Sequence, residues 1–175
     1  MRQGLSVPGA TVPPMHHTPP APSKSDRPAV VLDTNVVLDW LVFDDASCAR
    51  LAHQLQTGQL RWHATASMRN ELSSVLPRRQ FQRWSPDCER ILSVFDMLAL
   101  KCDEPPSAVD LMVKLRCHDQ DDQKFIDLAV AVGAHLLFSK DRALLALARP
   151  AVAHGVRVLT PAQWQRQGTA SLISG

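Results

Sequence analysis

The sequence predicts an α/β fold whose mostly parallel central sheet is covered by helices on both faces. Continuous apolar runs at 29–32 and 136–138 are typical of strands that are buried on both faces. These runs alternate with longer segments in which apolar residues recur at helical spacing. Strands that alternate with helices pair in parallel, so we expect their carboxyl ends to meet at one edge of the sheet.

The 175 residues suit one domain with a single hydrophobic core, which we assign to residues 29–167. Residues 1–28 hold seven of the 13 prolines, with Gly, Ser and Thr between them. Such a segment cannot bury enough apolar surface to offset the entropy lost on ordering, so we predict a disordered amino-terminal extension. Residues 168–175 are predicted to form a frayed tail.

The formal net charge of +2 lies entirely in the extension, where Arg2, Lys24 and Arg27 oppose Asp26 alone. The domain therefore lacks the large field of one sign that a duplex-coating protein shows. No segment approaches the roughly 18 consecutive apolar residues of a membrane span, so we expect no membrane partner. The cysteines show no paired CxxC spacing, which indicates the reduced thiols of a cytoplasmic protein rather than disulfides or a zinc site.

The first half of the domain is predicted to form two strands, at 29–32 and 60–64, each followed by two helices. Short helices are expected at 36–41 and 46–56, and Gly58 ends the second of them. The next helix starts at a cap formed by Thr65 or Ser67 and runs to about Leu76. A longer amphipathic helix is expected from Ser85-Pro86 to Leu100, because proline is favoured at the first helical position.

The second half is predicted to add two strands after a loop at Pro105-Pro106, and 109–115 fits either a strand or a single helical turn. Gly133 ends the first helix of this half, Pro150 ends the second, and Thr160-Pro161 opens the last one. The expected helices are 125–132 and 142–149 and the one after Pro161, and the expected strands are 136–138 and 156–159.

Two carboxylates occupy equivalent places in this arrangement, because Asp33 and Asp141 each follow a buried strand and precede a helix. In a parallel sheet both residues emerge at the same edge. Helix capping alone explains either residue, and it is worth about 1 kcal/mol. The presence of two such residues at one edge makes a shared site an equal alternative.

Glu71 is a third candidate, since it borders the apolar stripe formed by Met68, Leu72 and Val75 on its helix. No basic residue follows it at helical spacing, so no salt bridge within the helix explains the position. A carboxylate that leans toward the core needs a cation, a metal or a proton as partner. The alternative is a surface glutamate whose carboxylate reaches solvent.

Three further acids, Asp119, Asp121 and Asp122, precede the helix that starts near Phe125. One acid suffices to cap a helix, and the helix dipole keeps the others ionised. Carboxylates gathered at one edge would repel each other unless a hard divalent cation were bound among them. Two such ions about 4 Å apart can activate water and stabilise the leaving oxygen in phosphodiester cleavage.

The order of these motifs resembles that of PIN-domain nucleases. Asp33-Thr34-Asn35 matches the motif after the first strand, Glu71 the glutamate on a later helix, and Ser139-Lys140-Asp141 the T/S-x-D pattern after a strand. The DDQKF run from Asp121 and the VLTPAQW run from Val158 resemble a bacterial subgroup of VapC-like toxin components of toxin–antitoxin pairs. The resemblance covers about residues 29–167.

The resemblance implies a three-layer α/β/α sandwich and cleavage of single-stranded RNA with Mg²⁺ or Mn²⁺ as cofactor. The ion would be held by Asp33, Glu71, Asp122 and Asp141, with Asp119 and Asp121 as adjacent candidates for the third acid, and it would supply the attacking hydroxide. Asn35 and Ser139 would donate hydrogen bonds to these ligands. A toxin of this kind would have a cognate antitoxin that covers the acidic site, and homodimers are common in the family.

Four basic residues flank the helix that carries Glu71, and they are candidates for RNA binding: Arg69, Arg78, Arg79 and Arg83. Phe81 and Trp84 lie among them and would suit base stacking on a single strand. A solvated surface with ordinary arginines explains this pattern equally well. The alternative to a nuclease is a catalytically silent module that keeps the fold and binds RNA or a protein partner.

Overall fold

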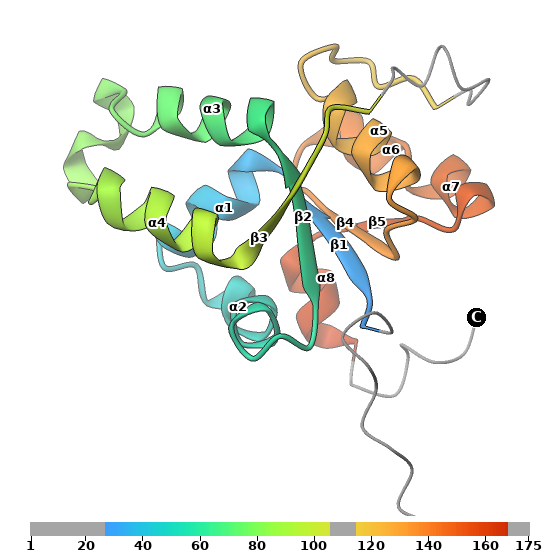
Figure 1. The fold of residues 1–175 in the computed structure, drawn as a ribbon, viewed down its shortest axis with the longest axis horizontal. Helices are drawn as coiled ribbons and strands as arrows, with labels where there is room; N and C mark the ends of the chain where they lie inside the picture. The colour runs from blue at the N-terminus through green and yellow to red at the C-terminus, as the bar shows by residue number, and fades with distance from the viewer. Residues whose placement is uncertain (1–26, 106–114, 168–175) are drawn as a thin grey trace, which may run out of the picture.

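The computed structural model describes residues 27–105 and 115–167 (Figure 1). The predicted frayed tail, nearly all of the predicted extension and most of the segment at 109–115 lie outside these residues. A five-stranded sheet forms the centre, with all four strand pairs parallel, as expected. Its strands are β1 (Ala29–Leu32), β2 (Arg61–Thr65), β3 (Ala99–Cys102), β4 (Leu136–Phe138) and β5 (Arg157–Leu159).

The strand order is β3-β2-β1-β4-β5, which places β1 at the centre. Val30 pairs with Trp62 of β2 on one side and with Leu136 of β4 on the other. The chain builds the sheet outward from β1 to β3 and then crosses over to add β4 and β5. The chain therefore adds strands first on one side of β1 and then on the other. Open α/β sheets bind their ligands in the crevice beside the strand at which the strand order reverses in this way.

Helices cover both faces of the sheet, so the three-layer α/β/α sandwich is confirmed (Figure 1). α5 packs on β1, β2 and β4, and α6 and α7 pack on β5, while α2 and α8 pack against each other. The helices are α1 (Thr34–Leu41), α2 (Ala49–Gln56), α3 (Ala66–Val75), α4 (Cys88–Leu98), α5 (Gln123–Ala131), α6 (Arg142–Ala146), α7 (Ala148–Ala151) and α8 (Pro161–Arg166), with short 3-10 turns η2 (Ala46–Cys48), η3 (Arg79–Trp84) and η4 (Val152–His154).

The helix predicted from Ser85-Pro86 to Leu100 is wrong at both ends. α4 begins at Cys88, where the Asp87 side chain caps it by accepting a hydrogen bond from the Arg90 N–H at 2.9 Å. Ser85 instead ends η3 with a left-handed backbone at φ 45°. At its other end α4 stops at Leu98, and Ala99–Cys102 forms the edge strand β3 on β2. The prediction failed because the residues of β3 continue the apolar pattern of the helix.

The helix predicted at 142–149 is divided at Leu147 into α6 and α7. Pro150 does not end a helix here but lies within α7. Proline is tolerated there because the first turn of a helix does not use its backbone N–H groups.

The core is built on the central strands, where Val30, Val31 and Leu137 are fully buried. Trp164 of α8 closes one side, with its ring 5.8 Å from that of Phe138 and its indole N–H donating to Gln54 at 2.9 Å. The four cysteines are free thiols. Within residues 27–105 and 115–167, no helix is long and apolar enough to cross a membrane.

Candidate active site

Asp33 is placed at the carboxyl edge of the sheet by the pairing of β1 with β4. Its backbone N–H continues the ladder by donating to the Phe138 carbonyl at 2.9 Å. Its carboxylate caps α1, where Oδ1 accepts from the Asn35 N–H at 3.2 Å. The second oxygen, Oδ2, accepts from the Ser139 hydroxyl at 2.7 Å, and the whole residue is only 1% exposed.

Ser139 joins the two aspartates that were predicted to share this edge. Its fully buried hydroxyl donates to Asp33 and accepts from the Asp141 N–H at 2.9 Å. The Asp141 carboxylate caps α6 through a hydrogen bond of 2.6 Å from the Ala143 N–H. Both aspartates are therefore helix caps, and Ser139 makes them neighbours at this edge.

Asp122 stands at the start of α5, but its side chain makes no capping hydrogen bond. Burial raises the pKa of this carboxyl to about 7, and the negative charges of Asp33, Asp141 and Asp119 add to the shift. Burial also raises the pKa of Asp33; the hydrogen bond from Ser139 opposes the shift, and the charges of Glu71 and Asp141 add to it. The carboxylates are thus within electrostatic reach of one another at this edge.

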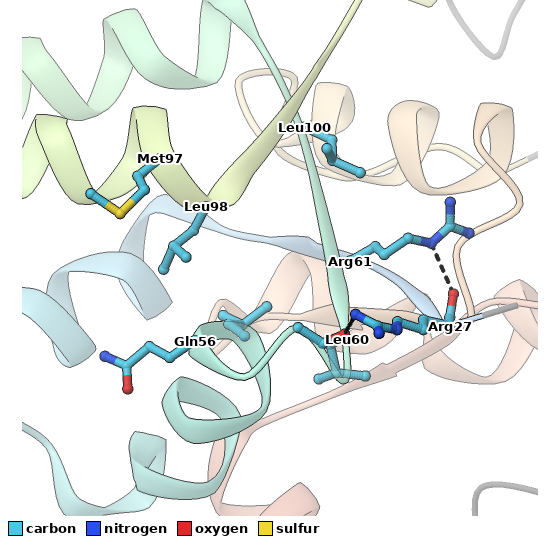
Figure 2. Close-up of a pocket in the computed structure, with 9 residues that line it drawn as sticks. Arg27, Gln56, Leu60, Arg61, Met97, Leu98 and Leu100 are labelled. Atoms are coloured by element: carbon cyan, nitrogen blue, oxygen red, sulfur yellow. Dashed lines mark hydrogen bonds between the residues drawn. The ribbon is translucent and has the colours of Figure 1, made fainter. Parts of the chain in front are cut away.

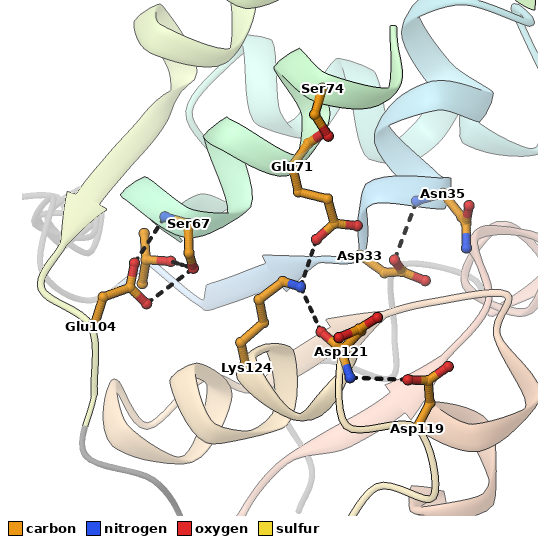
Figure 3. A network of polar contacts seen from close by, with 10 residues as sticks. Asp33, Asn35, Ser67, Glu71, Ser74, Glu104, Asp119, Asp121 and Lys124 are labelled. Carbon is orange, nitrogen blue, oxygen red and sulfur yellow. Dashed lines mark hydrogen bonds and ion pairs between the residues drawn. The ribbon is translucent and has the colours of Figure 1, made fainter. Parts of the chain in front are cut away.

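The other two acids in the run, Asp119 and Asp121, lie in the turn before α5 (Figure 3). The Asp119 Oδ1 accepts from the Asp121 N–H at 2.9 Å, which shapes the turn before α5 (Figure 3). The charge of Asp119 contributes to the raised pKa of Asp122, and both Asp119 and Asp121 are exposed. Asn35 has an exposed side chain and acts on Asp33 through its backbone N–H.

Glu71 reaches the same edge from α3, but the structure gives it a partner that the sequence did not reveal. Its Oε2 lies 2.6 Å from the Nζ of Lys124 on α5 (Figure 3). The alignment of this ion pair does not meet the geometry of a hydrogen bond, and Oε2 is buried without any other donor. Lys124 is 53 positions further along the chain, so no local spacing in the sequence indicates the pair.

The donors at this edge suit a hard divalent cation, because carboxylates are the ligands that Mg²⁺ and Mn²⁺ prefer. Burial is the main cause of the raised pKa values of Asp33 and Asp122, and the neighbouring negative charges add to both shifts. Within the described residues, however, no three acidic, histidine or cysteine side chains lie close enough to hold one ion.

The sequence of the chain matches the PIN domain family over residues 29–143, which is more than half of its length. The chain belongs to the PIN domain family. One solved structure with a similar fold is a chain of the VapBC2 complex from Rickettsia felis bound to a DNA fragment from its promoter. The two chains align with a TM-score of 0.52 and 13% sequence identity, over 75% of this chain and 98% of that chain. A comparison with curated proteins gave no match.

The basic residues predicted to bind RNA differ in their exposure and in whether an acidic side chain of this PIN domain already engages them. Arg69 is engaged in a two-pronged ion pair with Asp96, at 2.8 and 2.7 Å. Arg78, Arg79 and Arg83 are exposed along η3. The guanidinium of Arg83 lies 3.6 Å from the centre of the Trp84 ring.

A cavity of about 360 Å³ links this basic segment to the acidic edge. Asn35 and Asp141 line it on the side of the carboxylates, and Phe43 and Phe81 line its apolar part. Trp84 packs on Phe43 with ring centres 4.6 Å apart and remains 38% exposed. The PIN domain therefore places aromatic side chains in the same cavity as Asp141, next to the segment that carries the arginines.

A larger cavity of about 560 Å³ lies at the other end of the strands (Figure 2). Its lining includes Arg27, Arg61, Met97 and Leu100, and it contains no acidic residue. Arg27 fixes this region by donating to the Gly58 carbonyl at 2.6 Å, and its own carbonyl accepts from Arg61 at 2.9 Å. The chemistry of its lining offers no ligands for a cation, so the carboxyl edge is the candidate active site.

Proposed function

We propose that this PIN-domain protein is a metal-dependent endoribonuclease that cleaves single-stranded RNA and serves as the toxin of a toxin–antitoxin pair. The observation that carries the proposal is the Ser139 hydroxyl, which joins the Asp33 carboxylate to the Asp141 backbone at one edge, with Asp122 within electrostatic reach of both aspartates. If Asp33 and Asp141 served only to cap α1 and α6, Asp122 would not be needed beside them, because its side chain makes no capping hydrogen bond.

The ion would be Mg²⁺ or Mn²⁺, held by Asp33, Asp122 and Asp141, with Glu71 at the border of the group. When bound, such an ion neutralises phosphate charge and lowers the pKa of water, which makes hydroxide available for attack on a phosphodiester. Ser139 holds Asp33 and the backbone of Asp141 in a fixed relation. Burial of these side chains excludes bulk water, which strengthens their interaction with a bound cation.

RNA would reach this edge over the basic segment at η3. Arg78, Arg79 and Arg83 supply positive charges for phosphates, and Trp84 and Phe43 supply aromatic surface for an unpaired base. The net charge of the remaining domain is zero, so binding depends on this local patch rather than on a general field. These features favour a single strand over a duplex as substrate.

The toxin assignment rests on the DDQKF and VLTPAQW motifs and on the shared fold with a chain of the VapBC2 complex. The partner would be a cognate antitoxin that covers the acidic edge, and a homodimer in the cytoplasm is the expected working form. Expression of the chain alone should arrest growth, and co-expression of the neighbouring small reading frame should relieve the arrest. Unimpaired growth with an active purified nuclease would refute the toxin role.

Cleavage of a single-stranded RNA by the purified full chain tests the enzymatic part. We expect cleavage with Mg²⁺ or Mn²⁺, no cleavage with EDTA, and a loss of at least about 100-fold in Asp33→Asn. Asp44→Asn is the matched control, because Asp44 is an exposed loop residue with φ 51°, a backbone conformation that asparagine also adopts. Equal cleavage by Asp33→Asn and Asp44→Asn would show that the assigned site is wrong.

One observation favours the alternative of a silent binding module. Glu71 is engaged by Lys124, and within the described residues no three ligands are gathered for one ion. A calorimetric titration with Mn²⁺ separates the two functions: a saturable site supports the nuclease, and the lack of one supports the binding module.

A further inference from the structure

The cavity at the amino end of the strands is lined mainly by apolar side chains, and part of this lining is exposed (Figure 2). Met97 near the end of α4 is 79% exposed, and Leu100 of β3 is 47% exposed. Within the described part of the chain, the exposed large apolar residues are Trp84, Met97, Leu100 and Val152. Two of these four line the one cavity, and exposed apolar surface gathered in this way is typical of a binding site.

The chain enters the domain at this cavity, because Arg27, the first residue that the structure describes, belongs to the lining. The Arg27 guanidinium donates to the Gly58 carbonyl at 2.6 Å, and the Arg27 carbonyl accepts from the Arg61 side chain at 2.9 Å. A Cβ on Gly58 would lie only 2.8 Å from a guanidinium nitrogen of Arg27, so glycine makes this close contact possible. Figure 2 shows Arg27 and Arg61 across the cavity from Met97. The 26 residues that precede Arg27 therefore join the domain at the rim of the cavity.

Those preceding residues include a proline-rich run, VPPMHHTPPAP, at positions 12–22. Such a run favours polyproline II, an extended conformation without internal hydrogen bonds whose carbonyls remain free to accept from a partner. Protein grooves bind this preformed helix with little loss of conformational entropy. Val12, Met15 and the prolines supply apolar side chains for the cavity. The guanidinium groups of Arg27 and Arg61, each with five N–H donors, can serve the carbonyls.

The linker between this run and the domain is short enough to favour binding within one chain. Residues 23–26 span at most about 14 Å when fully extended. A short linker gives the tethered segment an effective concentration on the order of 1 mM at its site. A contact too weak to hold a separate peptide is therefore sufficient here.

We propose that residues 12–22 fold back onto this cavity and cover Met97, Leu98 and Leu100. The run then also protects β3, which pairs with β2 alone in the described sheet, as natural proteins commonly do for an edge strand. A second copy of the chain suits the place less well, because the Lys101 side chain on β3 is 71% exposed and charged residues on an edge strand oppose pairing. The proposed cover does not depend on nuclease activity.

Nuclear magnetic resonance of the full chain with ¹³C-labelled methionine methyl groups tests this directly. In the wild type we expect nuclear Overhauser contacts between the Met97 methyl group and proline protons, and protection of Met97 from a soluble paramagnetic agent. Loss of both is expected when four substitutions are combined in one variant: Pro13→Ser, Pro14→Ser, Pro19→Ser and Pro20→Ser. The methyl signal of Met68, which is 3% exposed in the core, reports that the domain is folded and should not change.

Two single variants separate the run from the rest of the chain. Pro8→Ser is the matched control, since Pro8 lies outside the run, and Met97 should remain as protected as in the wild type. Leu100→Ser changes the cavity itself and should reduce the contacts of Met97 with the proline protons. In both variants an unchanged Met68 signal shows that the domain is folded.

The proposed cover would be refuted if the paramagnetic agent reached Met97 equally in the wild type and in the four-proline variant. Protection of Met97 that survived the proline substitutions would also refute it, because another surface would then cover the cavity. Light scattering of the same samples identifies a second copy as that surface, since the protection would then be lost on dilution together with the dimer.

Discussion

Ser139 shows at the scale of one residue how a buried hydroxyl can organise a site. It donates to the carboxylate of Asp33 and accepts from the backbone N–H of Asp141, so it joins the carboxyl ends of β1 and β4. The Asp33 carboxylate is buried and the Asp141 N–H is partly buried, so removal of the hydroxyl leaves the buried oxygen of Asp33 without this donor. The hydroxyl therefore contributes both to stability and to the arrangement of the carboxylates.

We predict that Ser139→Ala lowers the free energy of unfolding by about 1–3 kcal/mol, because it leaves buried polar groups without a partner. It should also weaken Mn²⁺ binding by about 10- to 100-fold, as is usual when a group that orients a metal ligand is lost. Chemical denaturation and Mn²⁺ titration measure the two effects. Ser74→Ala is the control, since Ser74 is an exposed serine that donates to the Glu71 carbonyl at 2.8 Å. It should change neither quantity.

The raised pKa values of Asp122 and Asp33 predict how stability depends on pH. The pKa of Asp122 is about 7 in the folded protein, above its ordinary value of 3.8, because of burial and of the neighbouring negative charges. Between these values the folded state binds more protons than the unfolded state. The stabilisation is therefore complete below about pH 3.8 and is lost as the pH rises through 7. Asp33 acts in the same direction.

Melting temperatures measured in EDTA across this range should fall with rising pH, and the fall should be smaller in Asp122→Asn. Burial lowers the pKa of His63, which acts in the opposite direction, so the comparison with Asp122→Asn isolates the carboxylate. Mn²⁺ added at high pH should raise the melting temperature of the wild type, since it binds the ionised form. A wild type whose melting temperature followed the same pH dependence as Asp122→Asn would contradict the prediction.

The sequence predicted the positions of individual acidic residues where the ends of strands determine them. Asp33 and Asp141 follow buried strands of a parallel sheet, so their meeting follows from the topology alone. The pairing of Glu71 with Lys124 could not be predicted in this way. It depends on how α3 and α5 lie across the sheet, which no local periodicity encodes.

At the scale of elements, β3 shows where periodicity fails. Its four residues, Ala99–Cys102, are at the edge of the sheet, and Leu100 is 47% exposed there. A short edge strand with one covered face lacks the continuous apolar run that revealed β1 and β4. The strand is specified instead by its pairing with β2, which is a tertiary interaction.

The segment after β3 also supplies the cap of α3, which the sequence analysis had assigned to Thr65 or Ser67. Thr65 occupies the cap position of α3 but makes no capping hydrogen bond with its side chain. Glu104 replaces it, and its carboxylate accepts from the Ser67 N–H at 2.8 Å and from the Ser67 hydroxyl at 3.1 Å. The loop after β3 thereby stabilises the start of the helix that carries Glu71.

We predict that Glu104→Ala lowers the free energy of unfolding by about 1 kcal/mol, the usual value of a helix cap. Thermal or urea denaturation measures this loss. Asp103→Ala removes the adjacent exposed carboxylate and should leave stability within about 0.5 kcal/mol of the wild type, as surface substitutions usually do. Equal effects of the two substitutions would show that the cap is not used in solution.

At the scale of the whole molecule, the two ends of the sheet differ in chemistry. The carboxyl end carries the acids and adjoins the basic segment at η3, whereas the cavity at the amino end is lined without any acid. In this neutral domain, a single cavity lies between the carboxylates and the aromatic residues of the basic segment. RNA binding should therefore be strongly salt-dependent although the net charge is small.

Replacing Arg78, Arg79 and Arg83 together by glutamine should weaken the binding of single-stranded RNA and lower its salt dependence. The slope of log affinity against log salt should decrease by about 0.7 for each lost phosphate contact, or by about 2 for three. Fluorescence anisotropy in an Asp33→Asn background measures binding without cleavage. Replacing Arg149 and Arg166, two exposed arginines on α7 and α8, is the control and should leave the slope unchanged. The same slope in both multiple variants would place the RNA elsewhere.

The hydrogen bond between Ser139 and Asp33 joins residues that are 106 positions apart in the chain. During synthesis, β1 emerges early, but its neighbour β4 and the aspartate that follows it emerge only in the last quarter of the chain. A nascent chain therefore carries Asp33 long before it can carry the acidic edge. If the chain cleaves RNA as we propose, this topology delays activity during synthesis, because the acidic edge cannot assemble until β4 and Asp141 have been added.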